Sequence, residues 1–269
     1  MNKQITSTQN TYIKELIQLK EKSKQRKKTQ TFLIEGLREI SLAIGGHYKI
    51  EKLLVDTSII SDKALEKIIH SFTYKIDCIE ISNEVYQKLA LRGSTEGIIA
   101  VAKSKDLSLN SIQFKNKNPL ILVTEAPEKP GNIGALLRTA DAAGIDAVLI
   151  ANPKTDMYNP NIIRSSVGCV FTTTIATGTS SEIINFLKQH QINIYGAALT
   201  ASVEYQTINY TNASAIVVGT EATGLTEDWL QNTTANIIIP MRGKIDSMNV
   251  SVSAAILLFE AVRQRQLTN

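Results

Sequence analysis

The sequence predicts an α/β protein whose larger part is a parallel, Rossmann-like sheet. From residue 119 onward, short runs rich in Ile, Val and Leu alternate with stretches of helical periodicity. These runs are continuously apolar rather than alternating, which is typical of parallel strands covered by helices on both faces. The expected strands are 119–125, 146–151, 170–176, 192–199, 215–220 and 236–240. The expected helices are 132–143, about 161–167, 181–190, 225–231 and about 249–265.

The first 105 residues predict a second, smaller α/β unit. Strand-like runs at 52–56, 75–81 and 96–103 are separated by helical stretches at 61–72 and 82–90. The segment 32–44 is amphipathic, with apolar residues three or four positions apart at Leu33, Leu37, Ile40 and Ile44. Residues 106–118 are polar and without periodicity, as expected of a linker. We therefore predict an N-terminal domain at 1–105, a linker at 106–118 and a second domain at 119–269.

Composition favours a folded protein outside the membrane. The chain has 269 residues, of which 43% are hydrophobic and 20% charged. Its N-terminus has no apolar core of a signal peptide, and no run approaches the roughly 20 apolar residues that cross a bilayer. Two cysteines, Cys78 and Cys169, cannot form a disulfide framework and are expected to be buried free thiols. We expect a cytoplasmic protein without a membrane anchor.

The positive charge is concentrated at the N-terminus. The net charge is +4, yet residues 1–30 contain eight basic and two acidic side chains, so the remainder of the chain nets −2. The densest run is KEKSKQRKK at 20–28. Such a run is typical either of a solvated helix face or flexible arm, or of a surface that binds a polyanion such as RNA.

Several common sites are disfavoured by their missing residues. The turn after the strand at 119–125 reads EAPEKPGNIG, without the G-x-G-x-x-G of a dinucleotide site. The stretch GTEATGLT at 219–226 has Leu225 where a phosphate-binding loop needs lysine. The three histidines, His47, His70 and His190, are scattered, so we expect no metal site.

The helix that begins PGNIGALLRTADAAG at 130–144 carries polar residues at unusual places. Asn132 is predicted to be its N-cap, and Arg138 lies off the apolar stripe, which predicts that it faces away from the sheet or along its rim. The stripe consists of Ile133, Leu136, Leu137 and Ala140.

Two further turns place polar groups at strand ends. Glu221 follows a buried strand and lies between Gly219 and Gly224. After Pro240, a loop of small and polar residues leads to the last helix, which Ser247 or Asn249 is predicted to cap. The predicted apolar stripe of that helix is Val252, Ile256, Phe259 and Val262. Ligands of parallel sheets bind at the carboxyl ends of the strands, so these turns predict a binding site.

Taken in order, three segments resemble the motifs of a known family: NIGALLRTADAAG, VVGTEATGL and IPMRGKIDSMNVSVSAAILLFEAVRQR. They are similar to the three motifs of the SpoU/TrmH family of RNA 2′-O-ribose methyltransferases, of the SPOUT class, and the resemblance spans 119–266. One departure is Met248, where the family more often has leucine. The first half, through QNTYIKELIQLKEKSKQRKKTQTFLIEGLREI and TEGIIAVAK, resembles the family's N-terminal substrate-binding domain, which has the fold of a small ribosomal RNA-binding protein.

The resemblance implies S-adenosylmethionine as methyl donor, a homodimer with the site near its interface and a C-terminal trefoil knot. The donor-binding positions that it implies are Leu199, Gly219, Ile239 and Met248. The catalytic set that it implies is Arg138, Asn132, Glu221, Ser247 and Asn249. Because a guanidinium stays protonated in proteins, we expect Arg138 to stabilise the developing alkoxide rather than to remove its proton.

An RNA substrate also gives the basic residues a function. We expect phosphate contacts from Lys20, Lys22, Lys24, Arg26, Lys27, Lys28, Arg92 and Arg164. Ribosomal RNA is the favoured substrate, with transfer RNA as the alternative. A non-catalytic RNA-binding protein on the same fold is the main rival; a small-molecule enzyme on a Rossmann-like sheet is disfavoured by the missing glycine pattern.

Overall fold

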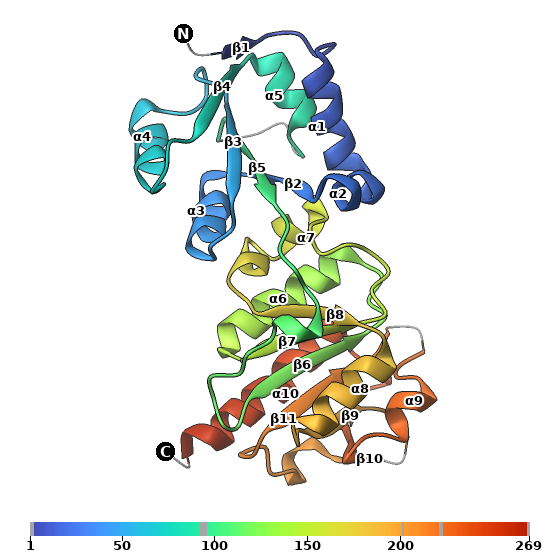
Figure 1. Cartoon of the computed structure of the whole chain (residues 1–269). Coiled ribbons are helices and arrows are strands. Elements are labelled where there is room, and N and C mark those ends of the chain that lie inside the picture. The colour runs from blue at the N-terminus through green and yellow to red at the C-terminus, as the bar shows by residue number, and fades with distance from the viewer. Residues whose placement is uncertain (1–2, 92–95, 201, 221–222, 268–269) are drawn as a thin grey trace. The chain divides into compact units, whose positions relative to one another are not determined.

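The computed structural model describes residues 3–91, 96–200, 202–220 and 223–267 of the 269-residue chain. The chain folds into two compact units (Figure 1). The first unit contains Met1–Lys105 together with Asp156–Thr172, and the second contains Asp106–Thr155 together with Thr173–Asn269.

The first unit is built on a mixed five-stranded sheet in the order β1-β4-β3-β5-β2. Its strands are β1 (Lys3–Ile5), β2 (Thr31–Glu35), β3 (Ile50–Val55), β4 (Asp77–Ile81) and β5 (Ile98–Lys103). The pairs β1–β4 and β3–β4 are parallel, whereas β5 runs antiparallel to β2 and β3. A core cluster joins one face of this sheet to two helices through residues such as Ile13, Leu16, Leu54, Val85 and Ile99.

Five helices from the N-terminal part of the chain belong to this unit: α1 (Thr11–Glu21), α2 (Ser23–Thr29), α3 (Leu37–Gly45), α4 (Asp62–His70) and α5 (Asn83–Leu89). Side-chain oxygens of Asn10, Ser61 and Ser82 cap α1, α4 and α5. The prediction of one amphipathic segment over 32–44 is wrong in its first part. Phe32–Glu35 lie in β2 and pair with β5, and the helix begins only at Leu37, because apolar residues four apart fit both a buried strand and a helix.

A segment distant in sequence completes the first unit. Residues 156–172, which lie within the range predicted for the second domain, form α7 (Pro160–Ser165) and the 3₁₀ turn η2 (Cys169–Phe171) and pack against β2 and α3. The ring of Phe32 stacks on that of Tyr158 at 4.2 Å between centroids, and a Cβ added to Gly46 would lie 2.1 Å from the carbonyl oxygen of Phe171. The strand predicted at 170–176 is therefore shorter and later, at Ile175–Gly178.

The second unit confirms the predicted parallel sheet. Its seven strands are β6 (Leu120–Glu125), β7 (Ala147–Ala151), β8 (Ile175–Gly178), β9 (Asn193–Ala197), β10 (Ser202–Glu204), β11 (Ser214–Val218) and β12 (Ala235–Ile238). They are ordered β10-β12-β9-β11-β6-β7-β8, and each neighbouring pair is parallel. Every residue of β6, β7 and β11 is buried, as their continuous apolar sequences predict.

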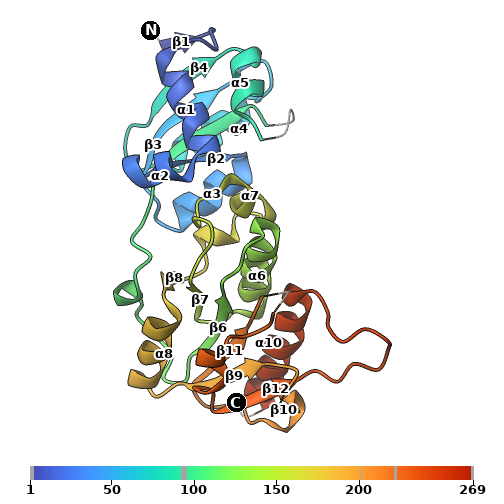
Figure 2. The ribbon, with the colours of Figure 1, turned by 90° about the vertical axis from the view of Figure 1, so that its right-hand side faces the viewer.

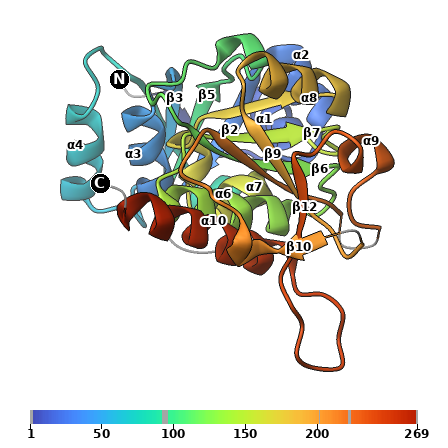
Figure 3. The ribbon, with the colours of Figure 1, turned by 90° about the horizontal axis from the view of Figure 1, so that it is seen from below.

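Helices cover both faces of this sheet. Figures 2 and 3 show α8 (Ser180–Gln189) on one side and α6 (Pro130–Ala143) with α10 (Val250–Leu267) on the other. The core on the α8 side includes Ile183, Leu187 and the fully buried Trp229 of α9 (Glu227–Leu230). The turn η3 (Tyr205–Thr207) follows β10.

The buried face of α10 differs from the prediction. The helix buries Ala254, Leu257, Leu258 and Ala261. Two residues of the predicted stripe, Val252 and Phe259, are instead 48% and 47% exposed. Because α10 is apolar on two sides, periodicity alone could not tell which side faces the sheet.

The predicted linker packs onto the second unit. Leu109–Ser111 form the 3₁₀ turn η1, Ile112 is buried in the core beside α8, and the backbone N–H of Thr177 donates to the carbonyl of Leu107 at 2.7 Å. Within the described residues neither Cys78 nor Cys169 forms a disulfide, and both are half-buried rather than buried. Within residues 3–91, 96–200, 202–220 and 223–267, no helix is long and apolar enough to span a membrane.

Candidate active site

A cavity of about 430 Å³ opens at the carboxyl ends of three neighbouring strands of the second unit. Its walls are the segments that follow β9, β11 and β12, together with the first turns of α10. The four predicted donor-binding residues, Leu199, Gly219, Ile239 and Met248, all line it. Apolar side chains such as Val218, Leu225 and Leu257 form much of the remaining surface. The cavity lies where open parallel sheets bind their ligands.

The loop after β11 approaches itself so closely that only glycine fits at its start. Thr220 and Gly224 exchange backbone hydrogen bonds of 3.0 and 3.1 Å, which hold these two positions side by side. A Cβ on Gly219 would lie 2.1 Å from the carbonyl carbon of Gly224 and 2.5 Å from the backbone nitrogen of Leu225. This turn therefore presents backbone to the cavity without a side chain at position 219.

A buried carboxylate that sequence reasoning missed anchors the far side of this loop. Glu125, at the end of β6, is only 2% exposed. One of its oxygens accepts the backbone N–H of Thr226 at 2.9 Å, and the other accepts the Thr226 hydroxyl at 2.8 Å. Ser180 donates to the same carboxylate at 3.3 Å and accepts the Trp229 indole N–H at 3.0 Å. The network fixes the position at which the loop leaves the cavity. The sequence signal that could have revealed Glu125 is an acidic residue at the end of an otherwise apolar, buried strand.

Two predicted catalytic residues meet at the start of two helices. Asn249 caps α10, as predicted, by accepting the backbone N–H of Ser251 at 3.0 Å. Its Nδ2 also donates to Oδ1 of Asn132 at 3.5 Å. The prediction that Asn132 caps α6 is wrong, because the helix begins at Pro130, with Lys129 at the N-cap, so Asn132 lies inside the first turn. Asn132 and Asn249 thus tie the beginning of α6 to the beginning of α10.

The other predicted catalytic residues are placed less closely. Ser247 lines the cavity, and its hydroxyl donates to Asp246 at 3.1 Å. Arg138 is exposed on α6, off the buried stripe as predicted, and is not among the residues that line the cavity. Glu221 lies outside the described residues.

The predicted RNA-binding residues of the first unit divide into two groups. Lys22, Lys24, Lys27 and Lys28 are exposed at the end of α1 and on α2, so the basic run is helical. The prediction that Arg26 binds RNA is wrong. Its side chain is buried, and its Nε and Nη2 donate to the carboxylate of Asp156 at 3.0 and 2.7 Å. It is therefore not available to a phosphate.

The remaining members of that set lie around a second cavity or outside the described residues. Lys20 is half-buried and donates to the carbonyls of Lys88 and Ala90 at 2.7 and 3.3 Å. Burial lowers the pKa of Lys20, and the positive charge of Lys88 adds to this effect. Arg164 on α7 is exposed, and Lys20 and Arg164 both line a cavity of the first unit. Arg92 lies in the part of the chain that the structure does not describe.

Comparison with known proteins agrees with this geometry. Residues 119–259 match the model of the SpoU rRNA Methylase family, and residues 10–100 match that of an MRM3-like substrate binding domain. The chain is 32% identical over 259 residues to the 23S rRNA (guanosine(2553)-2′-O)-methyltransferase RlmP of Bacillus subtilis, covering 96% of this chain and 98% of that protein.

Two solved structures are similar over nearly the whole chain. A crystal structure of an RNA 2′-O ribose methyltransferase matches with 40% identity and a TM-score of 0.84, covering 98% of this chain and 99% of that one. An AdoMet-bound rRNA methyltransferase from Sinorhizobium meliloti matches with 26% identity and a TM-score of 0.87, covering 97% of each chain.

Proposed function

We propose that this chain, which belongs to the SpoU rRNA methylase family, methylates a ribose 2′-hydroxyl of ribosomal RNA. As a member of that family it is an S-adenosylmethionine-dependent RNA 2′-O-methyltransferase. The observation that carries the proposal is the cavity at the ends of β9, β11 and β12, because the four expected donor-binding positions converge there. A cytoplasmic location follows from a ribosomal RNA substrate.

The residues of this cavity fit the methyl donor. The backbone around Gly219, where an added Cβ would collide with Gly224, offers N–H and C=O groups to a polar ligand at close range. Leu199, Ile239 and Met248 supply apolar contacts for the flat and aliphatic parts of such a molecule. When bound, the donor supplies an electrophilic methyl group on sulfur. The role of the chain is to hold the ribose oxygen in line with that methyl and to exclude water.

Arg138 is assigned to the charge that develops on the ribose oxygen. A guanidinium remains protonated in proteins, so it stabilises the alkoxide and binds the adjacent phosphate rather than acting as a base. The hydrogen bond between Asn249 and Asn132 supports a role for both in orienting α6 and the ribose. Ser247, on the cavity wall, is assigned to the same pocket, as is Glu221 from the family resemblance.

A homodimer is part of the proposal. The support is the outer side of α10, where Val252 and Phe259 remain about half exposed although seven residues apart on one helical face. A second chain that covered this side would also bring a partner close to the first turns of α10, which line the cavity.

The trefoil knot belongs to the proposal as well. Two observations support it. The strand β12 lies between β9 and β10 in the sheet, and the helix that follows β12, α10, packs on α6, which comes early in the second unit.

The first unit is proposed to bind the RNA. Lys22, Lys24, Lys27 and Lys28 provide exposed positive charge on α1 and α2 for the phosphate backbone. Residues 10–100, which contain these lysines, match a substrate-binding family. Transfer RNA remains the alternative substrate, and a direct comparison of the two RNAs as methyl acceptors decides between them.

The test is methyl transfer from labelled S-adenosylmethionine to 23S rRNA and to tRNA from cells that lack this protein. We expect incorporation into rRNA at one ribose. Arg138→Ala should lower the rate about 10²- to 10³-fold, the loss typical of removing one charge-stabilising donor. Calorimetry should find the donor affinity of this variant nearly unchanged, since Arg138 does not line the cavity.

The control is Lys188→Ala, which removes an exposed positive charge from α8, on the opposite face of the sheet from α6. Wild-type rates in Arg138→Ala would refute its assignment. Donor binding without transfer to either RNA, by the wild-type protein, would favour the non-catalytic RNA-binding alternative.

A further inference from the structure

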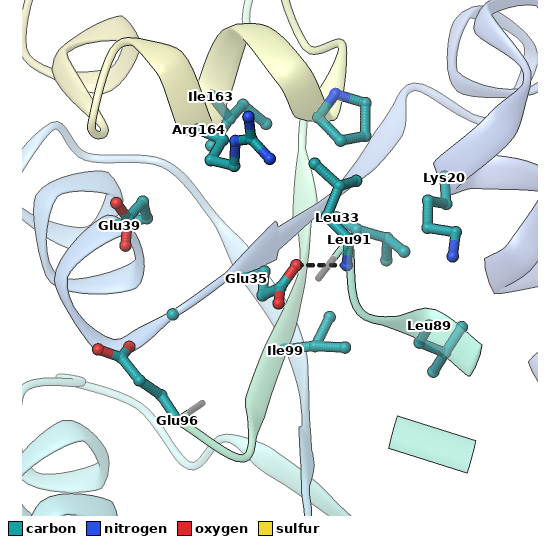
Figure 4. A pocket seen from close by; sticks show the side chains of 12 residues that line it. Lys20, Leu33, Glu35, Glu39, Leu89, Leu91, Glu96, Ile99, Ile163 and Arg164 are labelled. Carbon is teal, nitrogen blue, oxygen red and sulfur yellow. Dashed lines mark hydrogen bonds between the residues drawn. The ribbon is translucent and has the colours of Figure 1, made fainter. Parts of the chain in front are cut away.

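The first unit contains a cavity of about 240 Å³ whose lining combines carboxylates with apolar walls (Figure 4). We call it the acidic cavity and define it by Glu35, Glu39, Glu96, Leu33, Leu91 and Arg164. We propose that it holds an unpaired guanine base of the RNA, read by its carboxylates. This inference rests on the proposed function and adds to it a base-specific contact in the substrate-binding unit.

Two of the carboxylates are fixed by backbone donors. Glu35, on β2, accepts the backbone N–H of Leu91 at 2.7 Å, and Glu96 accepts the backbone N–H of Leu37. Figure 4 shows Glu35 between Glu39 and Glu96 on one side and Lys20 on the other. The carboxylates of Glu35 and Glu96 are therefore held in place before a ligand binds, which reduces the conformational entropy lost on binding.

The carboxylates also lie close to one another. A Cβ on Gly36 would lie 2.7 Å from Oε2 of Glu39 and 3.0 Å from Oε2 of Glu96, so two like charges converge on one glycine. Among the described residues, no ion pair involves Glu35, Glu39 or Arg164. Burial raises the pKa of Glu39, and the neighbouring Glu96 adds to that shift, although a backbone N–H and the charge of Arg38 oppose it. A ligand rich in N–H donors would relieve this arrangement.

The donor pattern selects one nucleobase. Guanine presents N1–H and N2–H₂ side by side, which matches two carboxylate oxygens. Adenine and cytosine present one amino group next to a ring nitrogen that accepts, and uracil presents one N–H between two carbonyls, so each would set an acceptor against a carboxylate. The apolar walls, including Leu33 and Leu91, suit the faces of a ring, and Arg164 at the rim suits the phosphate. The volume lies below the roughly 300–1,000 Å³ of pockets for larger ligands, which suits a single base.

The experiment uses the full-length protein and five RNA hairpins that differ only in one bulged nucleotide: G, inosine, A, C or U. Fluorescence anisotropy at one fixed salt concentration gives their dissociation constants, since phosphate contacts make affinity salt-dependent. We expect the G hairpin to bind about tenfold more tightly than A, C and U, as one bidentate base contact typically provides. Inosine, which lacks the 2-amino group, should fall between them.

Glu39→Gln and Glu35→Gln should each remove most of the preference for G while leaving the other hairpins within about twofold. Glutamine at position 35 can still accept the Leu91 N–H, so this variant should keep the fold. Glu66→Gln, on the exposed surface of α4, is the matched control and should behave as wild type.

Equal affinity of the wild-type protein for all five hairpins would overturn the inference, as would a G preference that survives when Glu35→Gln and Glu39→Gln are combined in one variant. Failure to bind any hairpin would also overturn it. The proposed function is judged separately, because methyl transfer to 23S rRNA by the same preparation does not depend on these hairpins.

Discussion

The two cavities of this protein are lined by different kinds of chemical groups. The cavity of the second unit is formed by backbone and apolar side chains at the ends of adjacent parallel strands, and the turn at Gly219 leaves no space for a side chain. The acidic cavity of the first unit combines apolar walls with charged side chains from α1, β2, α3, α7 and the segment before β5. The first should therefore be sensitive to added atoms, and the second to altered charge.

The second difference lies in what holds each wall. In the second unit, Glu125 fixes the loop through Thr226, and these residues belong to neighbouring elements of one sheet. In the first unit, α7 contributes Ile163 and Arg164 to the acidic cavity, and its segment is held by the buried pair Arg26–Asp156. A cavity wall thus depends on an ion pair between residues 130 positions apart.

The largest effect is expected from breaking that ion pair. Arg26→Ala leaves the carboxylate of Asp156, which is 9% exposed, without its partner. Loss of one member of a buried pair typically costs about 3–5 kcal/mol of unfolding free energy. Urea unfolding followed by circular dichroism measures this, and the bulged G hairpin should bind more weakly because the α7 wall is released.

The controls are Lys27→Ala, at an exposed neighbour on α2, and the double variant Arg26→Met with Asp156→Leu. The double variant should recover much of the stability, because apolar replacements of similar volume often match a buried pair. Donor binding in the second unit should be unaffected, and a large loss of donor affinity in Arg26→Ala would contradict the independence of the two cavities.

The next effect is expected from a single added carbon at Gly219. In Gly219→Ala the new Cβ would lie 2.1 Å from the Gly224 carbonyl carbon, so the loop must shift. Overpacking of this kind costs about 1–3 kcal/mol, or about fivefold to 150-fold in donor affinity by calorimetry. Gly45→Ala is the control, because no atom lies within 4 Å of a Cβ at that position. Unchanged donor affinity in Gly219→Ala would show that this turn does not contact the donor.

The sequence predicted the second cavity better than the first for a physical reason. Continuous apolar runs identify parallel strands, and the carboxyl ends of such strands meet at one edge. The family resemblance implied Leu199, Gly219, Ile239 and Met248 as one binding site, and all four line the cavity. No local sequence pattern predicts that Asp156 contacts Arg26. A basic run predicts exposed charge, and only the fold reveals which member is buried.

Two further misassignments have local causes. Asn132 looked like an N-cap, but Pro130 takes the first helical position, so the N-cap lies three residues earlier, at Lys129. In α10 the alternative apolar faces could not be ranked, and the outer one, with Val252 and Phe259, is the face that the proposed dimer would cover.

A smaller effect is expected from the exposed lysines, which contribute to RNA affinity through positive charge and not through contacts with a particular base. Reversal of Lys24, Lys27 and Lys28 to Glu should lower the slope of log affinity against log salt by roughly one for each phosphate that these lysines bind. The base preference among the bulged hairpins should persist, because phosphate contacts carry no sequence information. Filter binding across a salt series measures the slope. A slope equal to that of the wild type would mean that this run is only a solvated helix face.

The smallest effect concerns the acidic cavity without RNA. Burial raises the pKa of Glu39 in the folded protein above its ordinary value of about 4.3. For a raised pKa, the stabilising contribution is complete below the unfolded value and is lost as pH rises through the folded one. Glu39→Gln cannot lose a proton, so its melting temperature should gain on that of wild type as pH rises from about 4 through that window. Because Glu39 is only about half buried, the gain should be small, on the order of 1 °C. Scanning calorimetry across this pH range, with Glu66→Gln as control, measures it. A difference that stays constant with pH would mean that the acidic cavity stores no unfavourable charge and that its carboxylates need no donor from RNA.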